Sequence, residues 1–194
     1  MPLDVAIIGA GLGGLGAAVA LRRQGHNVTV FERYDFAGEV GASLSAASNG
    51  SRFLKEWGVD VKAAKPVILK KLIMHDWCSG QVENEYGLGD YKSKFGTVSN
   101  SFVVLDLPTY LVWWLPGLHE LMRRQDYNNF HRIDIHQQLL RSALETQGDG
   151  PPCMLKVNHK MVALDAEMGS ISFENGASFT ADLIVAADGI RVRP

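Results

Sequence analysis

Residues 3–33 read LDVAIIGAGLGGLGAAVALRRQGHNVTVFER, and this stretch predicts a strand, a glycine-rich turn, a helix and a second strand. The β-branched run at residues 5–8 suits a buried parallel strand. Gly9, Gly11 and Gly14 then form the pattern G-x-G-x-x-G. In this pattern the first glycine permits a tight turn, the second lets a pyrophosphate approach the backbone, and the third lets the helix pack against the strand. The stretch therefore predicts a dinucleotide site.

The residues after the glycine pattern agree with this interpretation. Gly25 is placed to end the helix, and the apolar run at residues 28–31 predicts the second strand. Glu32 follows that strand at a spacing typical of the acid that binds ribose hydroxyls. The alternatives are a βαβ turn that binds no nucleotide, and a signal peptide or membrane span. The glycines, Asp4 and the lack of a basic start argue against the latter.

Composition sets broad limits on the protein. The chain has 194 residues, of which 46% are hydrophobic and 21% charged, as is usual for a globular domain with its own core. A net charge of −2 gives no reason to expect nucleic acid or an acidic membrane surface as a partner. Cys78 and Cys153 stand far apart and form no metal or redox motif, so we expect no metal site. Since the sequence shows no targeting signal, we expect a cytoplasmic location. The oligomeric state is left open.

Further helices and strands are expected around this unit. Residues 49–57 and 134–147 predict helices, the second beginning with a capping box of Asp134 and Gln137. A hairpin, a β-meander with a tight turn at Asn175 and Gly176, and a second buried parallel strand are also expected. The hairpin would pair residues 67–77 with residues 81–86, and the meander would comprise residues 161–165, 170–173 and 177–180. The buried parallel strand would be residues 183–187, directly before Asp188 and Gly189.

Three segments together resemble a known family. The first is the glycine pattern that ends in Glu32 and Arg33. The second is HRIDIH at residues 131–136, which is similar to the family's R-x-x-[L/I]-H segment at the head of a helix. The third is ADLIVAADGI at residues 181–190, which is similar to its Asp-Gly motif. In this order the segments resemble the N-terminal portion of class A FAD-dependent monooxygenases, particularly the fungal salicylate-hydroxylase-like aromatic hydroxylases.

The resemblance implies a fold and an extent. We expect an α/β, Rossmann-like FAD-binding domain of the glutathione-reductase type, with a parallel sheet and a β-meander. This domain would occupy residues 1–194 and remain incomplete, ending before the substrate domain of the family.

The resemblance also implies roles for particular residues. Three roles have plain alternatives: Arg132 could be a solvated arginine, Val162 a core valine, and Asp188 part of an ordinary strand-end turn. Residues 41–45 resemble a loop beside the flavin ring, although its serines could be plain loop residues. The implied cofactor contacts are Gly9, Gly11 and Gly14 at the pyrophosphate, Glu32 at the ribose, Arg33 and Val162 at the adenine, Arg132 at the flavin or its phosphates, and Asp188 near the pyrophosphate.

The activity implied by the family is hydroxylation of a small aromatic, salicylate-like substrate that depends on NAD(P)H and oxygen. FAD carries this chemistry, so no triad or metal is needed, and no catalytic residue is identified. The histidines are interpreted as core or surface residues. Two other functions stay open: a non-catalytic FAD- or nucleotide-binding remnant, and an NAD-dependent dehydrogenase.

Two segments depart from the family pattern. Residues 98–125 form an apolar insert, and the chain ends soon after Asp188 and Gly189, where the family continues. Retained introns in the gene would explain both, and codons lacking GT and AG at the insert borders would refute this hypothesis. A hydrophobic lid or membrane hairpin is the rival, but Pro108 and Pro116 disfavour a spanning helix. We therefore expect an impaired chain, with weak FAD retention and no hydroxylation.

Overall fold

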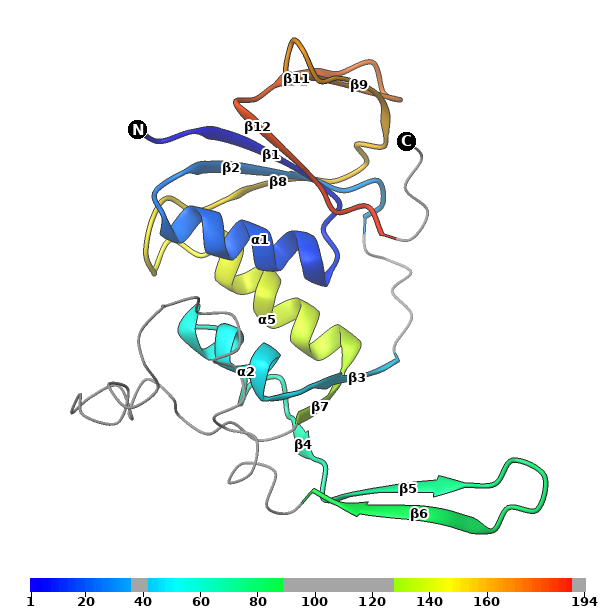
Figure 1. Cartoon of the computed structure of the whole chain (residues 1–194). Coiled ribbons are helices and arrows are strands. Elements are labelled where there is room, and N and C mark those ends of the chain that lie inside the picture. Colours follow the sequence, from blue (N-terminus) through cyan, green and yellow to red (C-terminus); the bar gives the residue numbers. More distant parts are fainter. Residues whose placement is uncertain (36–41, 89–127, 190–194) are drawn as a thin grey trace, which may run out of the picture. The chain divides into compact units, whose positions relative to one another are not determined.

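The computed structural model describes residues 1–35, 42–88 and 128–189, and it divides the chain into two units (Figure 1). The first unit comprises Met1–Ala42, Trp57–Ala64 and Arg132–Pro194. The second comprises Ser43–Glu56 and Lys65–His131. The apolar insert expected at residues 98–125 and the last five residues lie outside the described ranges.

The first unit is built on a four-stranded parallel sheet in the order β12-β1-β2-β8. Its strands are β1 (Asp4–Ile8), β2 (Asn27–Phe31), β8 (Met154–Lys156) and β12 (Leu183–Ala186). The pairing of β1 with β2 and β12 confirms the parallel strands predicted at both ends of the chain. Strand β12 is a border strand of this sheet and is only partly buried, so the prediction that it is fully buried was wrong.

Both faces of the central strands are covered, which explains their continuous apolar sequence. On one face lie the helices α1 (Leu12–Arg23) and α5 (Arg132–Leu144), packed side by side (Figure 1). On the other face, Ala6, Ile8 and Phe31 pack against the second sheet of the unit. The Phe31 ring stacks on Phe173 with centroids 4.6 Å apart. The parallel sheet is thus the middle layer of three.

This second sheet is the predicted β-meander. It consists of β9 (Met161–Asp165), β10 (Ser170–Phe173) and β11 (Ser178–Thr180), all antiparallel, with β10 in the centre. The predicted tight turn is present, because Gly176 adopts a φ of 82° and the Asn175 side chain accepts a hydrogen bond from the Ala177 N–H. The order of strands and turn confirms this part of the prediction.

The two helices differ in how well their ends were predicted. Helix α1 ends as expected, since Gly25 adopts a φ of 85° and its N–H donates to the Arg22 carbonyl. Helix α5 begins at Arg132, two residues before the predicted start. The capping box was therefore wrong: Asp134 lies inside the first turn, where its carboxylate still favours the positive end of the helix.

The second unit contains a small sheet, a helix and a hairpin. Its sheet has the order β3-β7-β4, formed by β3 (Ser43–Ala46), β7 (Asn128–His131) and β4 (Val67–Ile68). Helix α2 (Ser48–Glu56) follows β3 and confirms the helix expected there, while β5 (Lys71–His75) and β6 (Val82–Gly87) form the predicted hairpin. Two expectations need correction: residues 67–77 split into two strands, and the loop expected at residues 41–45 becomes β3 from Ser43 onward.

Within the residues that the structure describes, none of the helices combines the length and apolar character required to cross a membrane.

Candidate functional site

The glycine turn between β1 and α1 leaves no room for side chains at two of its positions. Gly9 adopts a φ of 105°, and a Cβ there would lie 2.5 Å from the Ala187 carbonyl oxygen. A Cβ on Gly14 would lie 1.9 Å from the Gly9 carbonyl oxygen. Both distances are far below van der Waals contact, so only glycine fits. The tight turn and close helix packing predicted for these two residues are therefore present.

The third glycine faces open space. Apart from the adjacent residues and the backbone of α1 itself, no atom that the structure describes lies within 4 Å of a Cβ built on Gly11 or Gly13. Gly11 is the N-cap residue of α1 and supplies no side-chain cap, so the first N–H groups of the helix have no partner from that residue. An uncapped helix N-terminus with space above it is suited to an anion such as a pyrophosphate.

The Glu32 carboxylate is bound to the backbone of the turn. Its Oε2 accepts a hydrogen bond from the Ala10 N–H at 2.8 Å, and its Oε1 accepts one from the Tyr34 N–H at 3.1 Å. The Glu32 carboxylate therefore lies directly beside the turn, as its predicted role at the ribose requires. Each oxygen has a second lone pair with which it could accept a hydroxyl hydrogen bond.

Helix α5 also contacts the glycine turn, through His136. His136 is 2% exposed, and its Nε2 lies 2.7 Å from the Ala10 carbonyl oxygen. Arg132 precedes His136 by four residues and so projects from the same face of α5, one turn closer to the helix start. Its backbone N–H donates to the Ala42 carbonyl. Arg132 as a whole is half-buried, and among the described residues no hydrogen bond or ion pair to its guanidinium is found.

Asp188 lies next to Gly9. The Ala187 N–H donates to the Ile8 carbonyl, and the Asp188 Cα would be 3.1 Å from a Cβ on Gly9. Within residues 1–35, 42–88 and 128–189, the buried Oδ1 of Asp188 has no hydrogen-bond partner. The motif at the end of β12 and the glycine turn, far apart in the sequence, therefore share one edge of the sheet, where ligands of open α/β sheets bind.

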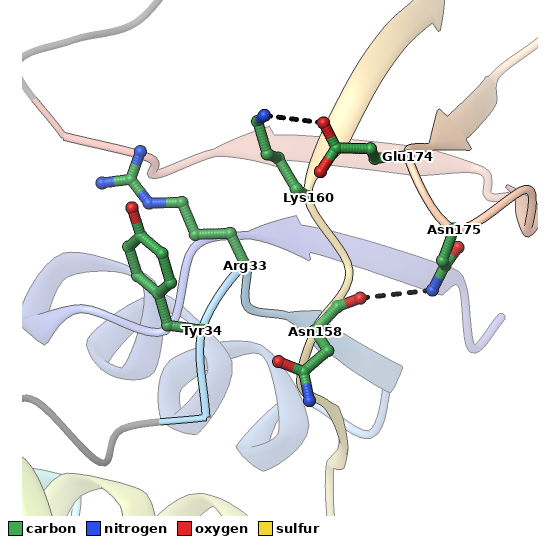
Figure 2. A pocket seen from close by; sticks show the side chains of 6 residues that line it. All are labelled: Arg33, Tyr34, Asn158, Lys160, Glu174 and Asn175. Atoms are coloured by element: carbon green, nitrogen blue, oxygen red, sulfur yellow. Dashed lines mark hydrogen bonds and ion pairs between the residues drawn. The ribbon is translucent and has the colours of Figure 1, made fainter.

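A pocket of about 510 Å³ opens beside the end of β2 (Figure 2). The Arg33 guanidinium lies over the Tyr34 ring, 4.9 Å from its centroid, and forms one wall. Across the pocket Lys160 pairs with Glu174 at 2.8 Å. The Asn175 side chain donates to the Asn158 carbonyl at 3.2 Å. The pocket is therefore polar, with a flat cationic wall adjacent to Glu32.

Val162 is less closely tied to the site. It lies on β9, a border strand of the meander, and is 57% exposed, so its alternative reading as a core valine was wrong. Its predicted contact with adenine stays a prediction. Ser43 and Ser45, expected in a flavin-side loop, belong to strand β3 of the second unit.

Sequence reasoning missed His136, Tyr34 and the polar residues on the far side of the pocket. The spacing of His136 from Arg132, one helical turn, was a usable signal for placing both on one face. The pocket residues carried no comparable signal, since they come from three separate turns. Among the described residues, no group of three or more His, Cys, Asp or Glu is arranged to hold a metal ion.

Comparison with known proteins identifies relatives of the chain. Residues 4–65 match the profile of the FAD dependent oxidoreductase family. The chain is 35% identical over 191 residues to hispidin-3-hydroxylase of Neonothopanus nambi, covering 97% of this chain and 38% of that protein. It is 32% identical over 161 residues to the FAD-dependent monooxygenase phomE' of Diaporthe leptostromiformis, covering 83% of this chain and 34% of that protein.

Solved structures share the fold. Klebsiella pneumoniae HpxO, crystallised with FAD and uric acid, matches with a TM-score of 0.61 and 22% identity, covering 96% of this chain and 39% of that one. The chain thus spans less than two fifths of the length of each of these relatives. The relatives that this chain matches in sequence are thus a hydroxylase and a FAD-dependent monooxygenase, and the chain is homologous to a part of each.

Proposed function

We propose that this chain forms the part of a FAD site that holds the adenosine diphosphate half of the cofactor. The observation that supports this most is the glycine turn. Gly9 and Gly14 have no room for a Cβ, whereas Gly11 faces open space at an uncapped helix start. A plain βαβ turn needs the first two features for packing, but it has no need of the third. Open space beside free N–H groups is suited to a pyrophosphate.

The neighbouring residues fit the rest of this half of FAD. The Glu32 carboxylate, fixed by two backbone N–H groups, would accept hydrogen bonds from the ribose hydroxyls. The pocket beside Arg33 and Tyr34 would receive the adenine, with the guanidinium plane parallel to the base. Arg132 would face the phosphates or the flavin, since a guanidinium suits bidentate phosphate contact. Asp188 would hold the turn at the pyrophosphate.

For the whole protein we propose the family's activity, the NAD(P)H- and oxygen-dependent hydroxylation of a small aromatic substrate. Bound FAD supplies the redox chemistry of that reaction. The residues described above would bind and orient the cofactor. Besides hispidin-3-hydroxylase, the relatives include the 3-hydroxybenzoate 6-hydroxylase of Polaromonas naphthalenivorans, which is 26% identical over 193 residues. These two names support a hydroxylated aromatic ring as the substrate class.

The test is to titrate the purified chain separately with FAD, ADP, FMN and NAD⁺ and to measure the binding of each by isothermal calorimetry. We expect FAD and ADP to bind with similar affinity, because the proposed contacts lie on the shared half, and FMN not to bind. Binding of FMN as tight as ADP, or no binding of any adenine nucleotide, would refute the proposal. NAD⁺ binding much tighter than FAD would favour the dehydrogenase alternative.

Hydroxylation is assayed separately. The chain is supplied with FAD, NADH or NADPH, oxygen and 3-hydroxybenzoate, and hydroxylated product is measured by chromatography. The contacts proposed above all lie on the adenosine diphosphate half of FAD, so we expect this chain by itself to bind the cofactor without forming product. Coupled product formation would show that the expected impairment is wrong.

A further inference from the structure

We propose that His136 is a positioning residue that sets the orientation of the Ala10–Gly11 peptide and thereby aims the Gly11 N–H at the ligand. This inference deepens the proposed function and rests on it for the identity of the ligand. It concerns a residue that sequence reasoning left as an ordinary core histidine.

The glycine turn is held by groups that come from outside the glycine pattern. The Gly9 N–H donates to the Phe31 carbonyl at 2.8 Å. The Ala10 N–H donates to Glu32, and the Ala10 carbonyl lies 2.7 Å from the His136 Nε2. Two successive peptide planes are therefore fixed by two different side chains, one at the end of β2 and one on α5.

Peptide geometry gives the bond to His136 a directional consequence. In a trans peptide the carbonyl and the next N–H point in opposite directions within one plane. Since the Ala10 carbonyl points to His136, the Gly11 N–H points away from α5. That is the direction expected for a donor to an anion at the start of α1, where the space around Gly11 is open.

The environment of His136 suits this role. The side chain is buried, so its bond to the carbonyl is shielded from water, and a buried acceptor left without a donor is unfavourable. A carbonyl oxygen only accepts hydrogen bonds, so the Nε2 atom carries the proton. A free rotation of the Ala10–Gly11 peptide would turn the Gly11 N–H toward the protein and remove one donor from the anion site.

The test compares three variants of the full chain. His136→Phe keeps the aromatic bulk but removes the donor, whereas His136→Gln places an amide N–H near the Nε2 position. Ile135→Val is the matched control: Ile135 is a neighbour on α5 and equally buried, but it has no hydrogen bond to the turn to lose. Affinity for FAD and ADP is measured at a temperature at which all variants are fully folded, and hydrogen exchange is followed in a peptide spanning residues 7–15.

We expect His136→Phe to weaken FAD and ADP binding about ten-fold, as the loss of one buried donor predicts. It should also speed exchange in residues 7–15, while His136→Gln restores both properties and Ile135→Val leaves both unchanged. Unchanged exchange in His136→Phe, or a His136→Gln variant as impaired as His136→Phe, would overturn the inference.

The exchange measurement separates two kinds of failure. If the wild-type chain binds no nucleotide, the proposed function fails, yet exchange in the turn still decides whether His136 holds the peptide. If His136→Phe does not fold, the decision passes to His136→Gln, in which faster exchange at residues 7–15 would count against the inference.

Discussion

Replacement of Arg22 by methionine is expected to destabilise the first unit strongly, although arginines near helix ends are usually solvated. Arg22 is in the last turn of α1 and is 1% exposed. Its Nη1 donates to the carbonyls of Ser142, Ala143 and Glu145 at 2.9–3.0 Å, and its Nη2 donates to Gly150 at 3.1 Å. The guanidinium therefore caps the C-terminus of α5, where carbonyls lack helical partners and the dipole favours a cation.

The expected loss of unfolding free energy depends on two opposing contributions of the Arg22 side chain. Hydrogen bonds to a charged group are worth about 1.5–3 kcal/mol each, but burying the guanidinium costs several kcal/mol. Methionine removes both contributions and leaves carbonyl groups without their donor. A buried carbonyl left without its donor costs about 1–3 kcal/mol, and four carbonyls lose the guanidinium, so we expect a loss of about 3 kcal/mol. This is a large part of an ordinary total stability of about 5–15 kcal/mol.

The assay is urea unfolding followed by far-UV circular dichroism, with Arg23→Met as the control. Arg23 is the next residue on α1, but its side chain is 30% exposed and pairs with Asp149, itself 65% exposed. Such a surface pair contributes about 0–1 kcal/mol, so the control should change little. A loss below about 1 kcal/mol in Arg22→Met, or equal losses in the two variants, would refute the reasoning.

Three further predictions follow from single contacts. Gly14→Ala should prevent folding of the first unit, because its Cβ would lie 1.9 Å from the Gly9 carbonyl oxygen. Gly11→Ala should fold normally and lose FAD affinity, because its Cβ would enter open space at the start of α1. Circular dichroism measures folding and calorimetry measures FAD affinity. Burial raises the pKa of the Cys153 thiol from 9.0 to about 11. At pH 8 a thiol reagent should therefore label only the exposed Cys78 until urea is added. Because the unfolded thiol ionises at lower pH than the folded one, the Cys153 contribution to stability should be lost as the pH rises from 9 toward 11. Phe173→Ala should cost about 3–5 kcal/mol of unfolding free energy by urea titration, since its buried ring stacks in the core, and a loss below about 1 kcal/mol would contradict the layer assignment.

The parts of the fold that sequence predicted are those with a strong local signal. The glycine pattern, the β-branched strands β1 and β2, and the Asn175–Gly176 turn each encode their geometry within a few adjacent residues. Strands β3, β7 and β8 were missed, because these short segments contain no β-branched residue and become strands through their partners. The capping box failed for a similar reason: the start of α5 follows the end of β7, and no local cap decides it.

Local signals placed Glu32 and the glycines of the candidate site, and they missed buried helix side chains that bind backbone carbonyls. Gly9 and Gly14 are recognisable because their lack of a side chain is itself the required property. His136 and Arg22 are not recognisable in this way, since a histidine or arginine on a helix is usually partly solvated. Their burial depends on which carbonyls the packing of α1 against α5 brings to them, and no pattern in either helix alone contains that information.

A nucleotide-binding βαβ unit has to meet a requirement that a plain βαβ unit does not. Steric exclusion at Gly9 and Gly14 serves helix packing equally well in both. What a bound anion requires in addition is that the peptides before α1 present their N–H groups outward, and a peptide that adjoins a glycine can turn more freely than one between two residues with a Cβ. Here Glu32 fixes the plane before Ala10 and His136 fixes the plane after it. On the proposal made above, the residues that aim the N–H groups of the glycine pattern at an anion lie outside the pattern, 22 and 126 positions along the chain from Ala10.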